Sequence, residues 1–409
     1  MNLIFQTAAC LLLGCLTIAG HQESFRLPAA APARQLPPPS GETVTRALAY
    51  LAEAQNPDGG WGGGSHTRQD IRDPHAVQSD PATTAFSAMA LLRAGHTLTS
   101  GAYQQHLARA LGFLLLAVEQ APAGSPTVTH LQGTQPQVKL GQNIDVSMTS
   151  QLLTRIKPYA SHDPSLTARI EAAQAVCLNK LQSSISQTGE VSGGTWAGVL
   201  QSAVATNALE EAYQDGATVD EVVVTSARKY QVKNIDAGSG EVKTEKAAGI
   251  QLYSLAGTTR ATAKEAKRAE AAVREARDAG TLSADAPVST ETLKQIGYDD
   301  AEASSMAEDY NANQAAVKAI QNESVLSGFG NNGGEEFLSF MMTSEAMALQ
   351  GGDAWTQWRA RMENTLTSIQ NPDGSYSGHH CITSPVFCTA AVVLTLTATP
   401  EALASQDKR

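Results

Sequence analysis

The sequence predicts an all-α protein, an α/α toroid in which about six helical hairpins close into a double ring. The first observation is a motif that occurs near both ends of the chain, at residues 55–61 (QNPDGGW) and 370–376 (QNPDGSY). The second is that each copy follows an amphipathic segment and precedes one that is apolar on nearly every side. Because an amphipathic helix faces water and an all-apolar helix is buried, each unit predicts an outer helix, a turn and an inner helix.

The repeated motif is expected to be structural rather than catalytic. Proline fixes a backbone dihedral of the turn, glycine adopts a conformation that other residues resist, and the aromatic residue stacks against the preceding turn. We assign this structural role to Gln55, Asp58, Gly59, Trp61, Gln370, Asp373, Gly374 and Tyr376.

Further helices of both kinds are expected between the two copies. Outer helices are predicted at 41–52, 103–118, 170–181, 218–232 and 355–369, and inner helices at 82–94, 145–156, 197–213, 246–255, 337–349 and 386–396. The segment 218–232 is rich in valine, so a strand is an alternative there. Residues 262–278 are densely charged and 300–322 are polar but helical, which predicts a polar helical insertion near 261–325 within a toroid domain that spans 41–400.

The N-terminal region is predicted to direct export. Residues 1–20 are apolar and carry no charged side chain, as in the core of an export signal, although an uncleaved anchor is an alternative. The stretch that ends in Gly14 and Cys15 also resembles a lipoprotein box; lipidated Cys15 would then be the chain's only means of membrane association. Residues 21–40 form a Pro/Ala-rich spacer, and 401–409 a polar tail. We therefore expect a periplasmic or secreted protein, with a lipoprotein as the variant.

The composition argues against nucleic acid as a partner. The chain has 409 residues and a formal net charge of −11, and its basic residues are scattered rather than gathered into a stripe. Its hydrophobic content of 42% can supply the core of one large repeat architecture.

The motif carries a resemblance to a known family. The spacing Leu51-x3-Gln55-x3-Gly59-x-Trp61, repeated from Leu366 to Tyr376, resembles the glutamine–tryptophan repeat of squalene and oxidosqualene cyclases. That superfamily shares an α/α toroid with the β subunits of protein prenyltransferases. The resemblance implies a terpenoid cyclase/prenyltransferase-like toroid that holds an isoprenoid or other apolar ligand in a central funnel.

The chain departs from the cyclases in two respects. It contains no Asp-x-Asp-Asp acid motif, and its 4 Trp, 9 Tyr and 8 Phe are few for a cavity that stabilises carbocations with aromatic faces. Polyene cyclisation is therefore disfavoured, and whether the chain is an enzyme stays open. A non-enzymatic repeat scaffold for protein interaction is one alternative, and a toroid polysaccharide lyase is a second.

The prenyltransferase resemblance suggests where a site would lie. Those enzymes hold zinc with an aspartate, a cysteine and a histidine at inner-helix starts, so His379, Cys381 and Asp145 are candidate metal ligands, and the cofactor is either none or zinc. Asp80, Asp145 and His379 are the catalytic candidates.

Two further histidines are candidates for ligand binding. His75 and His379 each precede an inner-helix proline by six residues, and we expect His75 and His380 to bind a ligand at the mouth of the funnel. In the structural alternative the histidines bond to neighbouring backbone and Asp80 only caps a helix.

The cysteines offer a competing interpretation. Of the five cysteines, Cys10 and Cys15 lie in the predicted signal. Among the remaining three, Cys381 and Cys388 are close together in the sequence. In an oxidising compartment a Cys381–Cys388 disulfide is expected, and it would exclude Cys381 as a zinc ligand.

Overall fold

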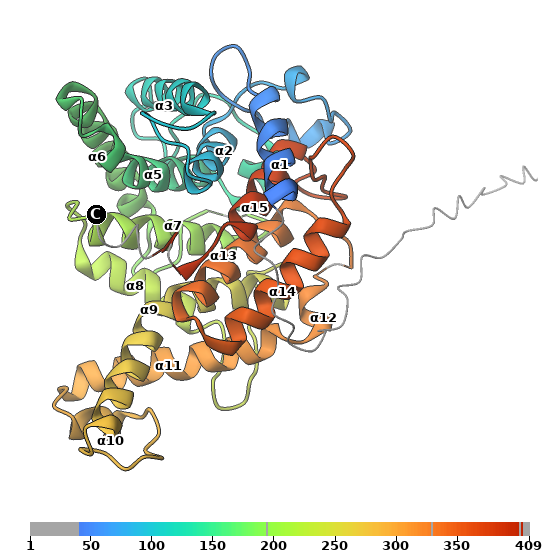
Figure 1. The fold of residues 1–409 in the computed structure, drawn as a ribbon. Helices are drawn as coiled ribbons and strands as arrows, with labels where there is room; N and C mark the ends of the chain where they lie inside the picture. The colour runs from blue at the N-terminus through green and yellow to red at the C-terminus, as the bar shows by residue number, and fades with distance from the viewer. Residues whose placement is uncertain (1–40, 194, 329, 401, 404–409) are drawn as a thin grey trace, which may run out of the picture.

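The computed structural model describes residues 41–193, 195–328, 330–400 and 402–403 (Figure 1). The predicted export signal, spacer and lipidation site, and most of the polar tail, lie outside these residues. Within them the chain forms α-helices and short 3-10 helices with isolated β-bridges and no strand, which confirms the all-α class. No helix in the described part combines the length and apolarity needed to cross a membrane.

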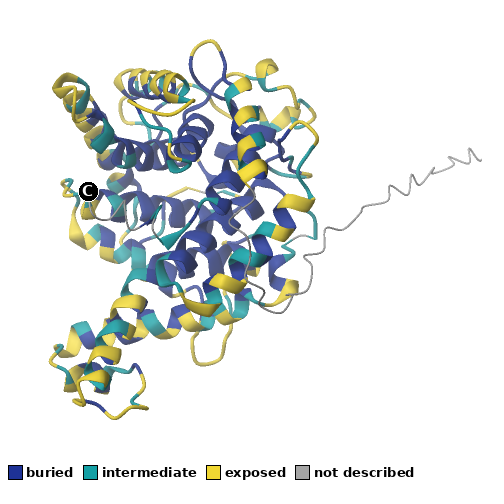
Figure 2. Ribbon diagram, in the orientation of Figure 1, coloured by how far each residue is buried: buried dark blue, intermediate teal, exposed yellow. Residues whose placement is uncertain are grey.

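Six helices form an inner ring. They are α2 (Pro81–Arg93), α5 (Ile144–Ile156), α7 (Gly198–Gln214), α9 (Gln251–Asp278), α13 (Gly334–Gln350) and α15 (Pro385–Leu396). Each packs against the next in this order, and α15 packs against α2, so the ring closes. These helices are dark blue along most of their length in Figure 2, because nearly all residues of α2, α5, α13 and α15 are buried on every face.

Six amphipathic helices lie outside this ring. They are α1 (Gly41–Glu53), α3 (Gln104–Glu119), α6 (Pro164–Ser184), α8 (Glu221–Val232), α11 (Asp300–Ile320) and α14 (Gly352–Ser368). The valine-rich segment is thus helix α8 and not a strand. Short elements connect the rings: α4 (Gln135–Leu140), α10 (Thr290–Gln295), α12 (Glu323–Leu326), η1 (His66–Arg68), η2 (Pro74–Ala76) and η3 (Lys157–Ala160).

Helix α9 extends beyond the ring. The charged segment 262–278, which was predicted as part of a polar helical insertion, continues α9 without a break to Asp278. Its second half packs with α10 and α11 around a small separate core that includes Val273, Leu293 and Met306. This part projects from the body in Figure 1.

The repeated motif joins neighbouring outer helices. The Nε2 of Gln55, after α1, donates to the carbonyl oxygen of His106 in α3 at 2.9 Å. In the second copy the Nε2 of Gln370, after α14, donates to the carbonyl oxygen of Thr43 in α1, also at 2.9 Å. The last outer helix is therefore bonded to the first, and the motif helps to close the outer ring.

The same motif also joins each outer helix to its inner partner. The backbone N–H of Trp61 donates to Thr84 Oγ1 in α2, and that of Tyr376 donates to Thr389 Oγ1 in α15, each at 2.9 Å. The aromatic side chains of Trp61 and Tyr376 are both buried. The indole N–H of Trp61 donates to the carbonyl oxygen of Leu51 at 2.7 Å.

An ion network crosses the interior of the inner ring. Its members are Arg93 (α2), Arg155 (α5), Glu211 (α7), Arg260 (α9) and Glu345 (α13). The guanidinium of Arg93 also donates to the carbonyl oxygen of Leu394 in α15, so all six inner helices take part. Side chains of opposite charge fill this level of the ring, in contrast to the apolar funnel expected from the sequence.

Candidate functional site

Three metal-ligating side chains meet at the rim where the inner helices begin. Glu335 opens α13, and His380 and Cys381 lie in the loop before α15. One ligand atom from each residue lies within 4.8 Å of the other two. Among the described residues this is the one such group of three, so the rim is the candidate site.

Backbone pairing fixes the loop against the start of α13. His379 N donates to the carbonyl oxygen of Asn332 at 2.7 Å, and Gly334 N donates to that of Ile382 at 2.9 Å. Gly333 leaves room for the site: a Cβ atom there would lie 2.9 Å from His380 Cε1 and 3.0 Å from Glu335 Oε2. Only glycine allows these groups to approach so closely.

The backbone at Cys381 is strained. Its φ of +57° lies in the left-handed region, which only Ala248 shares among the described non-glycine residues. A cysteine in this conformation costs free energy, and such strain concentrates at functional sites. The conformation is held by the neighbouring pairing of His379 and Ile382 with the α13 start.

Burial and like charge keep the site protonated in the absence of a cation. Burial and the adjacent Glu336 raise the pKa of Glu335 to about 8. Burial and the Glu335 charge raise the pKa of Cys381 to about 12. The Oε1 atom of Glu335 is buried, and the Cys381 thiol interacts with the same carboxylate.

A second glutamate supports the first. Glu336 accepts hydrogen bonds from the hydroxyl of Tyr253 at 2.6 Å and from Gly333 N at 2.7 Å. These bonds hold the glycine turn and the start of α13 in place. Glu336 therefore positions the site without being one of its three donors.

The donor set suits zinc. A carboxylate, an imidazole and a thiol are its usual ligands, and three protein donors are typical of a catalytic zinc site. The absence of a Cβ at Gly333 lets His380 and Glu335 approach each other closely, and the buried Oε1 of Glu335 is an atom that a bound cation would use. The residues present therefore fit a zinc ion.

The predicted aspartates, Asp80 and Asp145, lie elsewhere in the ring and accept hydrogen bonds from groups at the starts of neighbouring helices. Asp80 accepts bonds from Thr83 N at 2.8 Å and Gly63 N at 2.6 Å, which makes it the cap of α2. Asp145 accepts from Ala82 N at 3.1 Å and from Gln137 Nε2 at 2.7 Å. Both are fully buried. Burial raises the pKa of each, and the Asp80 charge raises that of Asp145 further.

The structure does not bring the predicted metal trio together. Of His379, Cys381 and Asp145, only Cys381 belongs to the rim group, in which His380 and Glu335 stand in place of the other two. His379 is exposed and contributes its backbone N–H to the loop. His75 is also exposed, and its Nδ1 lies 3.2 Å from Asn56 Oδ1 in the first turn motif.

The expected Cys381–Cys388 disulfide is not formed, and both residues are free cysteines. Cys388 lies in the first turn of α15 and is fully buried, with its Sγ 3.7 Å from the carbonyl oxygen of Ile382. Cys381 lies instead beside Glu335 and Lys139. The two side chains therefore lie in different environments, and no disulfide prevents Cys381 from acting as a metal ligand.

Glu335 was missed from the sequence, although a signal existed. Glu335 follows the pair Gly333 and Gly334 and lies at the start of an inner helix. Asp145 also lies at the start of an inner helix. Its place at the start of an inner helix could therefore have pointed to Glu335 as a candidate ligand, although the prenyltransferases have an aspartate in that role.

The closed double ring and its rim define a helical toroid with a three-donor centre, and one comparison points to a particular family. Residues 33–135 match the family model of the squalene-hopene cyclase C-terminal domain. The match covers α1, α2, α3 and the first copy of the motif, and it confirms the predicted resemblance to the squalene cyclase superfamily over these residues. No curated protein sequence matches the chain.

Proposed function

We propose that the chain is a toroid of the terpenoid cyclase/prenyltransferase type that binds a zinc ion at its rim through Glu335, His380 and Cys381. The observation that carries this proposal is that one ligand atom from each of a carboxylate, an imidazole and a thiol lies within 4.8 Å of the other two. A bound zinc ion would supply Lewis acidity and lower the pKa of a thiol or water that it coordinates.

The chain's own residues prepare the site in separate ways. The hydrogen bond between His380 Nε2 and the carbonyl oxygen of Asn331, at 2.9 Å, orients the imidazole ring. Glu335 provides the negative charge that a divalent cation needs beside a thiolate. The strained backbone of Cys381 holds its side chain at Glu335 rather than at Cys388.

The ligand class suggested by the resemblance is an isoprenoid or another lipid, in a protein exported through its N-terminal signal. Such a ligand would have to bind from the rim, because the Arg/Glu network fills the ring further down. Mass spectrometry of solvent extracts from the purified protein tests this part: a stoichiometric lipid supports it, and lipid-free protein contradicts it.

Metal analysis tests the zinc site. After incubation with zinc and gel filtration, we expect about one zinc per chain in the wild type. Glu335→Gln, His380→Ala and Cys381→Ser each remove a direct ligand and should weaken zinc affinity by more than the factor of about 10 to 100 that is typical of changes around a metal's ligands. The matched controls are His379→Ala and Cys388→Ser, which change the same residue types beside the site and should keep full zinc content. Metal-free wild type, or equal losses in His379→Ala and His380→Ala, would overturn the proposal.

A non-enzymatic scaffold is the second candidate, and one observation favours it. The projection made by α10 and the adjoining parts of α9 and α11 has its own small core and stands away from the ring (Figure 1). An arm of this kind offers a surface to a partner protein. Zinc-free protein that captures a partner through this arm would favour the scaffold.

A further inference from the structure

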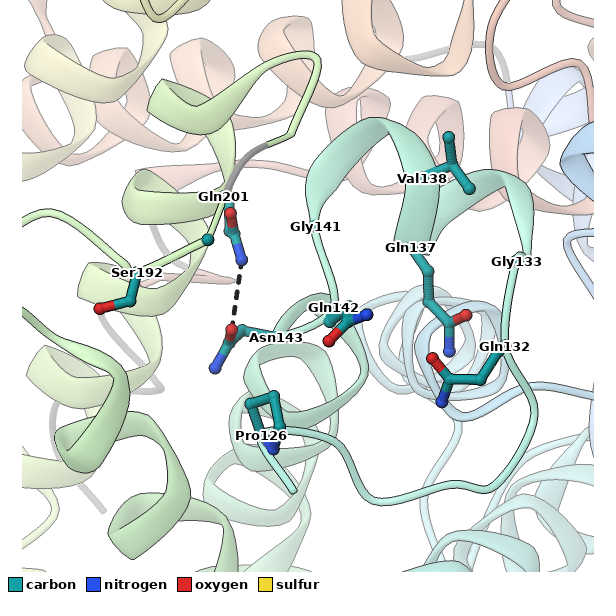
Figure 3. A pocket seen from close by; sticks show the side chains of 11 residues that line it. Pro126, Gln132, Gly133, Gln137, Val138, Gly141, Gln142, Asn143, Ser192 and Gln201 are labelled. Carbon is teal, nitrogen blue, oxygen red and sulfur yellow. Dashed lines mark hydrogen bonds between the residues drawn. The ribbon is translucent and has the colours of Figure 1, made fainter. Parts of the chain in front are cut away.

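A cavity lies on the rim, between α4 and the starts of α5 and α7 (Figure 3). It has a volume of about 520 Å³, which is within the usual range of small-molecule sites. Its lining consists of five carboxamide residues together with three glycines, a serine, a proline and a valine. No charged and no aromatic side chain is among these residues, and the carboxamides dominate.

One buried carboxamide in this cavity has an oxygen atom without a hydrogen-bond partner among the described residues. Gln201 is 2% exposed, and its Nε2 donates to Asn143 Oδ1 at 3.2 Å, as the dashed line in Figure 3 marks. Its Oε1 atom is buried and accepts no hydrogen bond from the described residues. A buried acceptor without a donor costs free energy. Because the atom is buried against Gly141, the carboxamide must turn toward the cavity for a ligand O–H or N–H to reach it and remove this cost.

The neighbouring groups show what else the ligand would meet. Asn143 is held by the bond from its Nδ2 to Ser184 Oγ at 2.8 Å. Gln137 is fully engaged with Asp145 and with the carbonyl oxygen of Leu131. Gln132 and Gln142 are exposed at the edge, where their amides are accessible to a ligand.

The lining selects the chemical class. An ionic ligand would find no counter-charge in the cavity. A peptide is recognised largely through pockets for its side chains, and the only apolar side chains in the lining are Pro126 and Val138. Carboxamides both donate and accept, which matches hydroxyl groups that do the same. We propose that this cavity binds a neutral saccharide.

The proposal is independent of the zinc site. Helix α4 separates the two: on its other side Gln135 Oε1 accepts hydrogen bonds from Thr383 N at 2.6 Å and Ser384 N at 3.2 Å, in the loop that follows Cys381. Saccharide binding should therefore persist in Cys381→Ser.

Titration calorimetry of the full chain with maltotriose, cellotriose and tri-N-acetylchitotriose tests this inference. We expect at least one of them to bind, and trigalacturonate and a blocked neutral tripeptide to show no binding. Val138→Trp, which fills the cavity from a partly exposed position, should weaken binding at least about tenfold. Gln201→Leu, which removes the free acceptor, should weaken it by about three- to tenfold.

The matched control is Val176→Trp, at an equally exposed valine on α6 that is not part of the lining. It should bind as the wild type does. The inference is overturned if none of the three sugars binds, if the tripeptide binds in their place, or if Val138→Trp has no greater effect than Val176→Trp.

Discussion

Glu335 shows how burial and neighbours control the chemistry of a single side chain. It is fully buried, next to Glu336, and its pKa is raised to about 8. Without a cation the carboxyl group is therefore mostly protonated at neutral pH. A zinc ion must displace this proton and that of Cys381, whose pKa is raised to about 12.

Zinc affinity should consequently rise steeply with pH. Well below pH 8 both groups are mainly protonated in the metal-free protein, so zinc binding releases two protons and the affinity should increase by about 100-fold per pH unit between pH 6 and 7. The slope should fall toward about tenfold per unit as Glu335 ionises near pH 8. Competition with a chromophoric chelator at pH 6, 7 and 8 measures this slope. Glu335→Gln, which cannot lose a proton, should bind more weakly and reduce the slope to about tenfold per unit. A pH-independent affinity would exclude the proposed ligands.

At the scale of elements, the repeated motif explains why the fold was predictable. Its apolar spacing, turn residues and aromatic ring are local signals, and the helices they predicted are α1, α2, α14 and α15. The bonds from Gln55 and Gln370 to the next outer helix were not predictable, because they join segments that only the closed ring brings together.

The glycines of the motif allow close contact between outer helices. Gly374 has φ +90°, and a Cβ there would lie 2.5 Å from the carbonyl oxygen of Arg46 in α1. Gly124 has φ +68° with open space around it. Gly124→Ala should cost only the left-handed strain of about 1 kcal/mol. Gly374→Ala should cost at least about 2 kcal/mol more, because α1 must also move. Urea unfolding measures both, and equal costs would show that the contact is unimportant.

The rim site was only partly predictable, for a related reason. The loop before α15 was predicted as a site, with His379 and Cys381 as metal ligands and His380 as a ligand-binding residue, and of these only His380 and Cys381 belong to the rim group. Glu335 comes from a different repeat, and its approach depends on Gly333 and on the pairing of two distant loops. The spacing of Cys381 and Cys388 suggested a disulfide, but spacing does not reveal that one thiol lies beside Glu335 and the other is buried in α15.

At the scale of the whole molecule, the ion network binds the inner ring together. Glu345 is 1% exposed in its side chain and contacts Arg93, Arg155 and Arg260 from three other helices. These guanidinium groups hold the pKa of Glu345 at about 2, in spite of its burial. The carboxylate therefore stays charged at all ordinary pH values.

Removing this charge should destabilise the fold strongly. Glu345→Gln leaves buried guanidinium groups with too few counter-charges, and we expect a loss of about 3–5 kcal/mol in the free energy of unfolding. The control is Glu119→Gln, whose partner Arg169 is nearly half exposed, and its loss should stay within about 1 kcal/mol. Equal losses in chemical denaturation would contradict a structural role for the network.

The pH dependence of stability should reflect the opposing shifts of the buried acids. Asp80, Asp145, Glu335, Glu210 and Asp309 have raised pKa values, the last two to about 7 and about 6, so the folded chain binds more protons than the unfolded chain above pH 4. Stability from these groups falls as the pH rises from about 4 to 8. The lowered pKa of Glu345 has the opposite effect, and its contribution is lost as the pH falls from about 4.5 toward 2.

The thermal midpoint of the metal-free protein should therefore be highest at about pH 4 and fall as the pH rises toward 8, because the five raised pKa values outweigh the one lowered value. Half-buried histidines such as His96 and His106, whose pKa values burial lowers, oppose the alkaline decline only up to about pH 6.5. Scanning calorimetry from pH 3 to 9 measures the profile. Glu335→Gln should flatten it between pH 6 and 8 and leave the acid side unchanged, because the rim and the ion network titrate independently. A midpoint that rises steadily from pH 5 to 8 would show that the buried carboxyl groups do not control stability.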